Sequence, residues 1–303
     1  MLARVIRDFE DRDAEAAAAL IAEHTPWLQT AAGLRHREAS LPPRARRRTW
    51  VAEVDGAIVG WAEAEFDWVA EEPDVGRVWA VVAPSHRRRG LGSQLFERAY
   101  AHDVEHGATE VRSWSFEESD RFLEARGFAK TRVERLSAVD PRTADTSALD
   151  ARTDVRVVPL TAMQDRLPEV YALFTEALAD MPSDHPETNL SYDEWLTETL
   201  GDPDLSHEGS VVVLADDRPV ALSWVNVDAT RGVAEQQLTG TLRAYRRRGL
   251  ARHAKLAVLR WCAEQGITRL ATGNDSTNAG MLAINSQLGF RPFAVETEWV
   301  KRP

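Results

Sequence analysis

The sequence HRRRGLG, residues 86–92, returns as YRRRGLA, residues 245–251. Each copy follows an apolar run rich in β-branched residues and precedes an amphipathic helical pattern, so each lies between a predicted strand and a predicted helix. Both predicted helices stop at a glycine, Gly107 and Gly266, in the position that a left-handed C-cap favours. A segment that returns in the second half of the chain with the same neighbours predicts two similar domains.

The surroundings of the two copies also repeat. After each helix comes a short strand-like run and then a short helix that closes on Gly-Phe, at Gly127 and at Gly289. Before each copy, residues 49–66 and residues 210–227 read as hairpins, the first turning at Asp55-Gly56. Each half thus alternates strands and helices around an Arg-rich loop, which predicts an α+β fold with a mixed sheet.

Length and composition fit two globular domains. The chain has 303 residues, of which 44% are hydrophobic and 28% charged. We expect one domain at residues 1–140 and a second at residues 155–303. Residues 141–154 are polar and carry Pro141, which is a linker composition.

Charge and cysteine content limit the classes of binding partner and the kinds of site that the sequence supports. The formal net charge of −11, from 37 Lys and Arg against 48 Asp and Glu, argues against nucleic acid and anionic membranes and favours a cationic partner such as an amine. Cys262 is the single cysteine and reads as a small core residue. The first residues lack a signal-peptide core, no long apolar run is present, and no metal-ligand spacing is visible, so we expect a cytoplasmic protein without a metal.

The Arg-rich loops have the chemistry of an anion site. A strand that runs through three arginines and a glycine into a helix offers backbone N–H groups, the positive end of a helix dipole and cationic side chains. Gly90 and Gly249 allow a phosphate to approach the backbone closely, and the small Gly92 and Ala251 leave the first helical turn uncrowded.

In these matched surroundings the loops resemble the acetyl-CoA motif of the GCN5-related N-acetyltransferase (GNAT) family, Gln/Arg-x-x-Gly-x-Gly/Ala. The motif residues are Arg87, Arg88, Arg89, Gly90, Leu91 and Gly92, and again Arg246, Arg247, Arg248, Gly249, Leu250 and Ala251. The resemblance implies two tandem GNAT folds, each a mixed, mostly antiparallel sheet flanked by helices, and acetyl-CoA as cofactor. The tandem arrangement is also similar to double-domain members of the mycothiol synthase type.

The resemblance implies further cofactor contacts. The strand before each loop should separate from its neighbour and hold the pantetheine arm by main-chain bonds, near Val82 in the first half and near Thr239 and Thr241 in the second. An Asn before the closing glycine commonly contacts the cofactor in the family, and Asn278 holds that position. Asn278 also reads as a plain helix N-cap, and the two roles can coexist.

Acetyl transfer to a primary amine needs a base for the ammonium and a donor for the leaving thiolate. The family usually supplies the thiolate donor as a Tyr, at the positions that are Leu123 and Asn285 here; none of the four tyrosines lies in a closing helix. Asn285 or Ser286 can hydrogen-bond or protonate the sulfur, and Glu235 is the candidate base, so the second half is predicted to be catalytic. Glu235 equally reads as a surface residue at a strand end.

Residues 177–195 form a long acidic segment where this fold builds its acceptor pocket. Asp180, Asp184 and His185 are candidates for binding a cationic small-molecule substrate, and a solvated connector is the alternative reading. In the first half, Glu63 and Glu65 alternate with alanines and read as solvent-facing, and RARRR at residues 44–48 reads as a solvated basic turn.

Two other functions compete with an N-acetyltransferase. Because Tyr is absent from both thiolate positions, the chain also fits a non-catalytic CoA-binding or scaffold protein. The first half can also be purely structural. The sequence does not identify the acceptor amine, since polyamines, aminoglycosides, amino acids, aminosugar thiols and peptides all fit. The protein can be a monomer with an internal pseudo-dimer or a homodimer.

Overall fold

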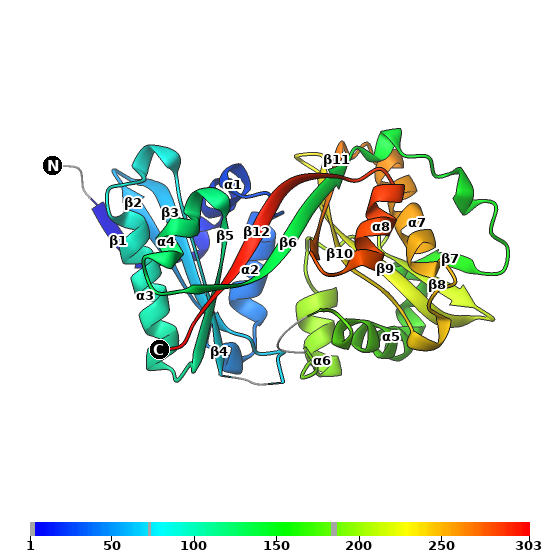
Figure 1. The fold of residues 1–303 in the computed structure, drawn as a ribbon, viewed down its shortest axis with the longest axis horizontal. Helices are drawn as coiled ribbons and strands as arrows, with labels where there is room; N and C mark the ends of the chain where they lie inside the picture. Colours follow the sequence, from blue (N-terminus) through cyan, green and yellow to red (C-terminus); the bar gives the residue numbers. More distant parts are fainter. Residues whose placement is uncertain (1–3, 72–73, 183–186) are drawn as a thin grey trace. The chain divides into compact units, whose positions relative to one another are not determined.

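The computed structural model describes residues 4–71, 74–182 and 187–303, and the chain divides into two compact units. Unit 1 runs to Val133 and also contains Val295–Pro303, while unit 2 comprises Glu134–Ala294. Each unit has a mixed sheet flanked by helices (Figure 1). The predicted α+β fold of two similar domains is therefore confirmed.

The sheet of unit 1 has the strand order β1-β2-β3-β4-β5-β12. Helices α1 and α2 pack on one face of this sheet, and α3 and α4 pack on the other. Strand β3 contributes residues to both hydrophobic clusters, because the side chains of a strand point alternately to its two faces. The elements from the first part of the chain are β1 Arg4–Asp8, α1 Ala14–His24, α2 Ala31–Ser40, β2 Arg48–Val54, β3 Ala57–Phe66, β4 Val75–Val82, α3 Leu91–Glu105, β5 Glu110–Phe116, α4 Asp120–Glu124 and β6 Ala129–Val139.

The sheet of unit 2 has the order β6-β11-β10-β9-β8-β7, and both α5 and α7 pack on β9 and β10. The remaining elements are β7 Arg156–Pro159, α5 Leu167–Ala179, α6 Tyr192–Glu194, β8 Val211–Ala215, β9 Arg218–Asp228, β10 Val233–Thr241, α7 Leu250–Glu264, β11 Arg269–Asp275, α8 Ala279–Gln287 and β12 Arg291–Lys301.

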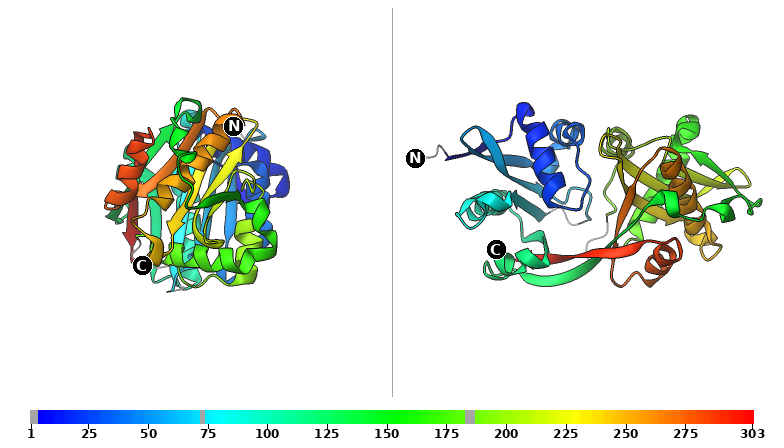
Figure 2. Two further views of the ribbon diagram at one scale, coloured as in Figure 1. Left: turned by 90° about the vertical axis from the view of Figure 1, so that its right-hand side faces the viewer. Right: turned by 90° about the horizontal axis from the view of Figure 1, so that it is seen from above.

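Two strands are exchanged between the halves of the sequence. The second part of β6, Glu134 to Val139, pairs antiparallel with β11 of unit 2. Strand β12 continues from α8 (Figure 2), and its residues Glu296 to Lys301 pair antiparallel with β5 of unit 1. The units therefore differ from the expected ranges 1–140 and 155–303, because a strand pattern in a sequence does not say which sheet the strand joins.

The segment expected to be a linker is ordered against unit 2. Residues 141–154 contain the short 3-10 turns Pro141–Thr143 and Ser147–Leu149, which contact helix α7. Arg260 of α7 donates to both carboxylate oxygens of Asp150, at 2.7 and 2.8 Å. Polar composition thus reflects exposure here and not a flexible connection.

Both predicted hairpins are present, and their turns explain why the sequence revealed them. Asp55 and Gly56 have φ values of 50° and 84°, and Asp216 and Asp217 have values of 47° and 62°. Two successive left-handed residues form the turn that matches the twist of a hairpin. Gly and Asp tolerate this conformation better than most residues.

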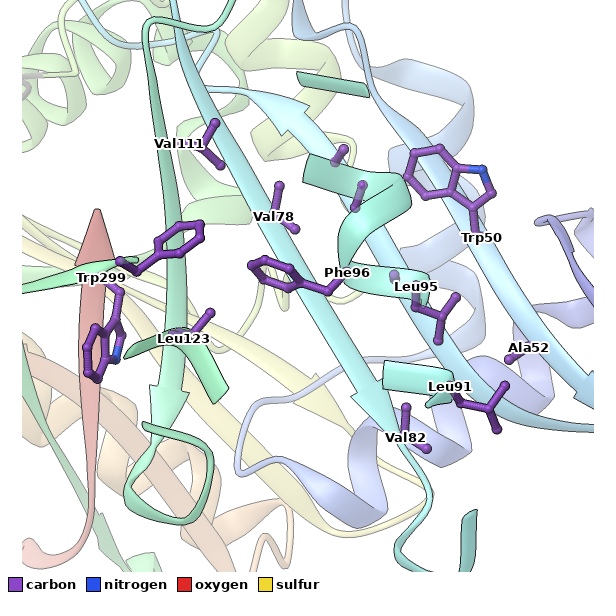
Figure 3. Packing of buried hydrophobic residues seen from close by; sticks show 14 of the residues in the cluster. Trp50, Ala52, Val78, Val82, Leu91, Leu95, Phe96, Val111, Leu123 and Trp299 are labelled. Carbon is purple, nitrogen blue, oxygen red and sulfur yellow. The ribbon is translucent and has the colours of Figure 1, made fainter. Parts of the chain in front are cut away.

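The core of unit 1 lies between its sheet and helix α3 (Figure 3). Phe96 of α3 has its ring centre 5.3 Å from that of Phe122 and 5.6 Å from that of Phe128. Leu123 belongs to the same buried cluster, and so does Trp299 of the exchanged strand β12. Strand β12 therefore completes the core of unit 1 as well as its sheet.

Glu63 and Glu65 are buried, so the prediction that they face solvent is wrong. Arg47 forms ion pairs with both carboxylates, at 2.5 and 2.6 Å, and Arg37 of helix α2 lies 3.6 and 3.5 Å from them. Helix α2 also supplies Glu38, which accepts from Arg47 at 2.8 Å. The alternation in the sequence revealed two faces, but nothing in it showed that α2 covers the charged one.

The basic run at residues 44–48 is solvated in part, as predicted: Arg44, Arg46 and Arg48 are exposed, whereas the Arg47 side chain is only 5% exposed. Besides Arg47, three of its guanidinium groups lie over aromatic rings at 4.8 to 5.6 Å, a geometry that cation–π attraction favours. The pairs are Arg44 with Trp68, Arg46 with Phe66 and Arg48 with Trp50.

Helix α3 carries a buried acid. Asp103 has 0% of its surface exposed, and neither of its carboxylate oxygens has a hydrogen-bond partner among the described residues. Burial, with a smaller contribution from Glu65, raises the pKa of Asp103 to about 8. The corresponding residue of helix α7 is Cys262, which is buried as expected, and burial raises its thiol pKa to about 12.

We expect Asp103→Asn to make the protein more stable than wild type at alkaline pH. The carboxyl group of Asp103 is protonated in the folded protein up to about pH 8 but ionises near 3.8 when unfolded, so wild-type stability falls as the pH rises between these values. The variant should lack this loss and gain about 5 kcal/mol over wild type at pH 9 compared with pH 4. Urea unfolding at both pH values measures the difference.

Glu105→Gln is the matched control, because Glu105 is exposed on the same helix. Its stability should change with pH as that of the wild type does. Parallel pH profiles for wild type and Asp103→Asn would show that Asp103 ionises normally and would contradict the buried-acid assignment.

Candidate functional site

The two Arg-rich loops have the same backbone conformation. After a 3-10 turn, Arg88 and Gly90 adopt φ values of 61° and 81°, and Arg247 and Gly249 adopt 60° and 74°. Each glycine is the N-cap of the following helix, α3 or α7. Because the first N–H groups of a helix have no intrahelical partner, each loop has the donors that an anion site requires.

Arginine side chains fix each loop from behind. In each loop, the first arginine donates a hydrogen bond to a carbonyl oxygen of the preceding strand. A second arginine, from near the start of the unit, donates to the carbonyl oxygen of the third loop arginine. The bonds are Arg87 Nε to Val82 O (2.9 Å), Arg246 Nε to Thr241 O (3.1 Å), Arg4 Nη1 to Arg89 O (2.9 Å) and Arg152 Nη1 to Arg248 O (2.7 Å). The last two bonds could not be predicted, because Arg4 and Arg152 lie far from the loops along the chain.

The strand before each loop separates from its parallel neighbour. Strands β4 and β5 pair only over Val75 to Arg77, and β10 and β11 only over Val233 to Glu235. The rest of each strand, up to Val82 or Thr241, keeps its other neighbour and leaves one edge of main-chain groups open. The separation implied by the family resemblance is thus confirmed.

Strand β10 carries a bulge that β4 lacks. The register of β10 with β9 shifts between Gln236 and Thr239, whereas the pairing of β4 with β3, described over its whole length, is continuous. At the bulge, Gln236 Nε2 donates to Ser223 Oγ at 2.6 Å, and the Ser223 and Thr239 hydroxyls lie 2.8 Å apart. A bulge re-aims side chains and is common beside active sites.

Glu235 stands where β10 and β11 separate. It pairs with Ala271 as the last parallel residue, and its carboxylate accepts from Gln237 Nε2 at 3.2 Å. The corresponding residue of unit 1, also last in its parallel pair, is Arg77, which binds Asp67. The two units therefore place opposite charges at the same position.

Helix α8 places its three candidate residues differently. Asn278 is the N-cap, and its Oδ1 accepts from Met281 N at 3.2 Å, so the capping role is confirmed. Asn285 is 3% exposed and donates from Nδ2 to Asn274 Oδ1 at 2.5 Å, whereas Ser286 is exposed. Neighbouring residues of a helix point about 100° apart, so Asn285 and Ser286 do not face the same atom.

Asp180 contacts the second Arg-rich loop and the turn before it. Its carboxylate accepts from Arg243 Nε at 2.9 Å and pairs with Arg246, and the hydrogen bond from Arg243 is the main reason that the pKa of Asp180 is lowered to about 2. Its charge is balanced by two guanidinium groups, and its role in binding a cationic substrate stays a prediction. Asp184 and His185 lie outside the described residues.

Unit 2 also contains a cluster of aromatic rings that the sequence pattern did not predict. Trp195 is buried and has its ring centre 6.0 Å from that of Trp224 on β9, which in turn lies 4.9 Å from that of Phe174 on α5. Tyr192 stacks on Trp195 at 5.8 Å. Because Trp195, Trp224 and Phe174 are buried, the cluster is part of the core between α5 and the sheet of unit 2.

Lys255 is a buried charge that the sequence did not reveal. It is 1% exposed, its Nζ lies 5.1 Å from the ring centre of Phe290, and burial lowers its pKa to about 7. The corresponding residue of unit 1 is Phe96, which packs on Phe128. A lysine thus occupies a position that is part of the hydrophobic core in unit 1.

Comparison with family models now decides the family. The model of the acetyltransferase (GNAT) family matches residues 14–128 and again residues 168–290. The chain belongs to the GNAT family and contains two copies of its fold. Members of this family are acetyltransferases that generally use acetyl-CoA.

Solved structures agree with the tandem fold. A tandem GNAT protein from the clavulanic acid biosynthesis pathway superposes with a TM-score of 0.76 at 19% identity, over 99% of this chain and 98% of that one. A GCN5-related N-acetyltransferase from Sphaerobacter thermophilus gives 0.70 at 18% identity, over 99% and 96%. Comparison with curated proteins gives no match.

Unit 2 fits the pantetheine arm of acetyl-CoA by one structural test. Three buried oxygens around β10 and α8 have no hydrogen-bond partner among the described residues: Gln236 Oε1, Thr241 Oγ1 and Asn285 Oδ1. Such oxygens need a donor, and a cofactor arm with amide N–H groups supplies donors. Arg246 to Ala251 would hold the phosphates, and Thr239 and Thr241 the arm.

No helix within the described residues is long and apolar enough to cross a membrane. Among the same residues, no group of three or more His, Cys, Asp and Glu side chains is arranged to hold a metal ion.

We expect Lys255→Met to stabilise the protein at neutral pH. Because the pKa of Lys255 is lowered from 10.5 to about 7, the folded protein binds this proton less readily than the unfolded chain, and wild-type stability rises with pH between 7 and 10.5. The variant should be about 2–4 kcal/mol more stable at pH 6.5, and its advantage should shrink toward pH 10. Denaturant unfolding across this range measures it.

Lys130→Met provides the control, since the Lys130 side chain is 55% exposed. Its stability difference from wild type should show no such dependence between pH 7 and 10. A constant difference for Lys255→Met would mean that the Lys255 amine keeps an ordinary pKa.

Proposed function

We propose that the chain transfers the acetyl group of acetyl-CoA to the primary amine of a small molecule, and that unit 2 carries out the reaction. The observation that supports this assignment is the contrast between Glu235 and Arg77. Both stand where the parallel strands separate, but only the carboxylate can attract an ammonium group and accept its proton. The bulge beside Glu235 has no counterpart in β4.

Acetyl-CoA supplies the activated acetyl thioester when bound. Glu235 would hold the acceptor ammonium and take one of its protons, so that the neutral amine attacks the carbonyl carbon directly. N–H groups on the open edge of β10 would stabilise the charge that develops on the carbonyl oxygen. The second amide hydrogen of Asn285 can be donated to the sulfur, with water as the source of the thiol proton.

Unit 1 lacks this arrangement on the corresponding face. Glu63 and Glu65 are already paired with Arg47, and Arg77 with Asp67, so these carboxylates are neutralised inside the unit. The net charge of −11 supports a cationic acceptor. We therefore assign the amine site to unit 2.

We expect Glu235→Gln to lower kcat about 10²–10⁴-fold with little change in acetyl-CoA affinity, because the amide keeps the shape but cannot accept a proton. The remaining rate should rise with pH as more of the free amine is neutral. An amine panel with detection of the released thiol measures the rate, and calorimetry measures acetyl-CoA binding.

Glu208→Gln, an exposed change in the same unit, should leave kcat unchanged. Tight binding of acetyl-CoA with no amine-dependent thiol release from the wild-type protein would instead identify a non-catalytic CoA-binding protein. Full activity of Glu235→Gln would remove Glu235 from the reaction.

Variants of the two Arg-rich loops test which unit carries out the reaction. Arg89 and Arg248 are exposed at equivalent loop positions, so charge reversal at either should leave the fold intact. We expect Arg248→Glu to raise the KM for acetyl-CoA about tenfold or more, since a charge-assisted contact to phosphate is worth about 1.5–3 kcal/mol. Arg89→Glu should leave turnover unchanged. The reverse result in steady-state kinetics would place the reaction in unit 1.

A further inference from the structure

An ion pair in unit 1 joins the two sides of the gap between β4 and β5. These strands pair only as far as Arg77, so the gap opens toward their carboxyl ends. Arg87 belongs to the loop after β4, and Glu118 lies in the 3-10 turn Glu117–Ser119 directly after β5. Arg87 Nη1 donates to Glu118 Oε1 at 3.0 Å, while Arg87 Nε is bound to Val82 O at the end of β4. The ion pair therefore spans the open end of the gap.

Unit 2 has an uncharged residue at the place of Glu118. Glu110 and Arg269 are the equivalent first residues of β5 and β11 in the parallel pairs, and counting from them brings Thr277 to the position of Glu118. The main-chain N–H of Thr277 donates to Asp275 Oδ1 at 2.7 Å, so this turn folds back on its own strand. Thr277 cannot hold a loop arginine by charge.

The first loop arginine of unit 2 has its acid partner on a different element. Arg246 pairs with Asp180, the residue that ends α5, and the same carboxylate also binds Arg243. One negative charge is thus shared between two guanidinium groups, and the loop keeps an excess of positive charge. In unit 1, Pro84 stands at the place of Arg243, so no second guanidinium comes from that position.

The two arrangements have different consequences for an anionic ligand. A phosphate that binds Arg87 has to displace Glu118, and the displaced carboxylate then stays nearby as a like charge. Both side chains are partly exposed, at 39% and 67%, so the ion pair can open but works against the phosphate while it is closed. In unit 2 the acid lies on the side of α5 and not across the gap.

We propose that Glu118 lowers the affinity of unit 1 for CoA, because it holds Arg87 across the open end of the gap and competes with the phosphates for that guanidinium. Glu118 is thus a residue that determines which unit binds the cofactor more tightly. This inference goes beyond the proposed function, which concerns the reaction in unit 2 and requires nothing of the loop in unit 1.

Calorimetry with CoA on the full chain tests this inference. Arg248→Glu serves as the background, because charge reversal there weakens the phosphate site of unit 2. In this background we expect Glu118→Gln, which keeps the side-chain size but removes the charge, to bind CoA about fivefold more tightly. This factor corresponds to about 1 kcal/mol, the upper range for an exposed ion pair. Adding Arg89→Glu should abolish the gain, which assigns it to unit 1.

Two controls separate the ion pair from a general effect of charge. Glu117→Gln removes the same charge from the same exposed turn and should leave the affinity for CoA nearly unchanged, because Glu118 still holds Arg87. In a double-mutant cycle with Arg87→Met, Glu118→Gln should no longer strengthen binding, since the two residues act as a pair. Thermal unfolding of each variant shows that it is folded.

The outcomes separate this inference from the proposed function. A gain for Glu118→Gln that depends on both Arg87 and Arg89 supports the inference. No gain, or an equal gain for Glu117→Gln, would overturn it and leave the proposed function of unit 2 intact. The proposed function fails on a different measurement, namely the absence of amine-dependent thiol release from the wild-type chain.

Discussion

The early end of the parallel pairing between β10 and β11 is the constraint on which the site of unit 2 depends. Only Val233 to Glu235 pair in parallel, so the remaining main-chain groups of β10 are open on one side. The bulge, the unpaired Gln236 oxygen and the loop that begins after Thr241 all lie on this open part. If the pairing continued, these groups would be used within the sheet and no ligand could reach them.

Local features were predictable from the sequence because local chemistry determines them. Two left-handed residues form each hairpin turn, a glycine begins each helix after an Arg-rich loop, and Asn278 caps α8. Features that depend on distant segments were not. Glu63 is buried by helix α2, Asp180 is paired with Arg243, and neither partner is evident from the sequence pattern around these acids.

The two units show how one fold can carry different interiors. The loops and their arginine tethers have the same geometry in both, whereas the interior next to them is apolar in unit 1 and polar in unit 2. The interiors differ at two more positions: unit 1 buries Asp103 where unit 2 has Cys262, and unit 2 buries Lys255 where unit 1 has Phe96. Packing against the sheet fixes the backbone, and side-chain chemistry can then change within it.

The exchange of β6 and β12 has a consequence for how the chain becomes folded during synthesis. The last strand of unit 1 is made of residues 295–303, which the ribosome adds after all of unit 2. Unit 1 therefore waits, with the edge of β5 and the place of Trp299 uncovered, until the rest of the chain has emerged. The N-terminal half, although made first, is completed last.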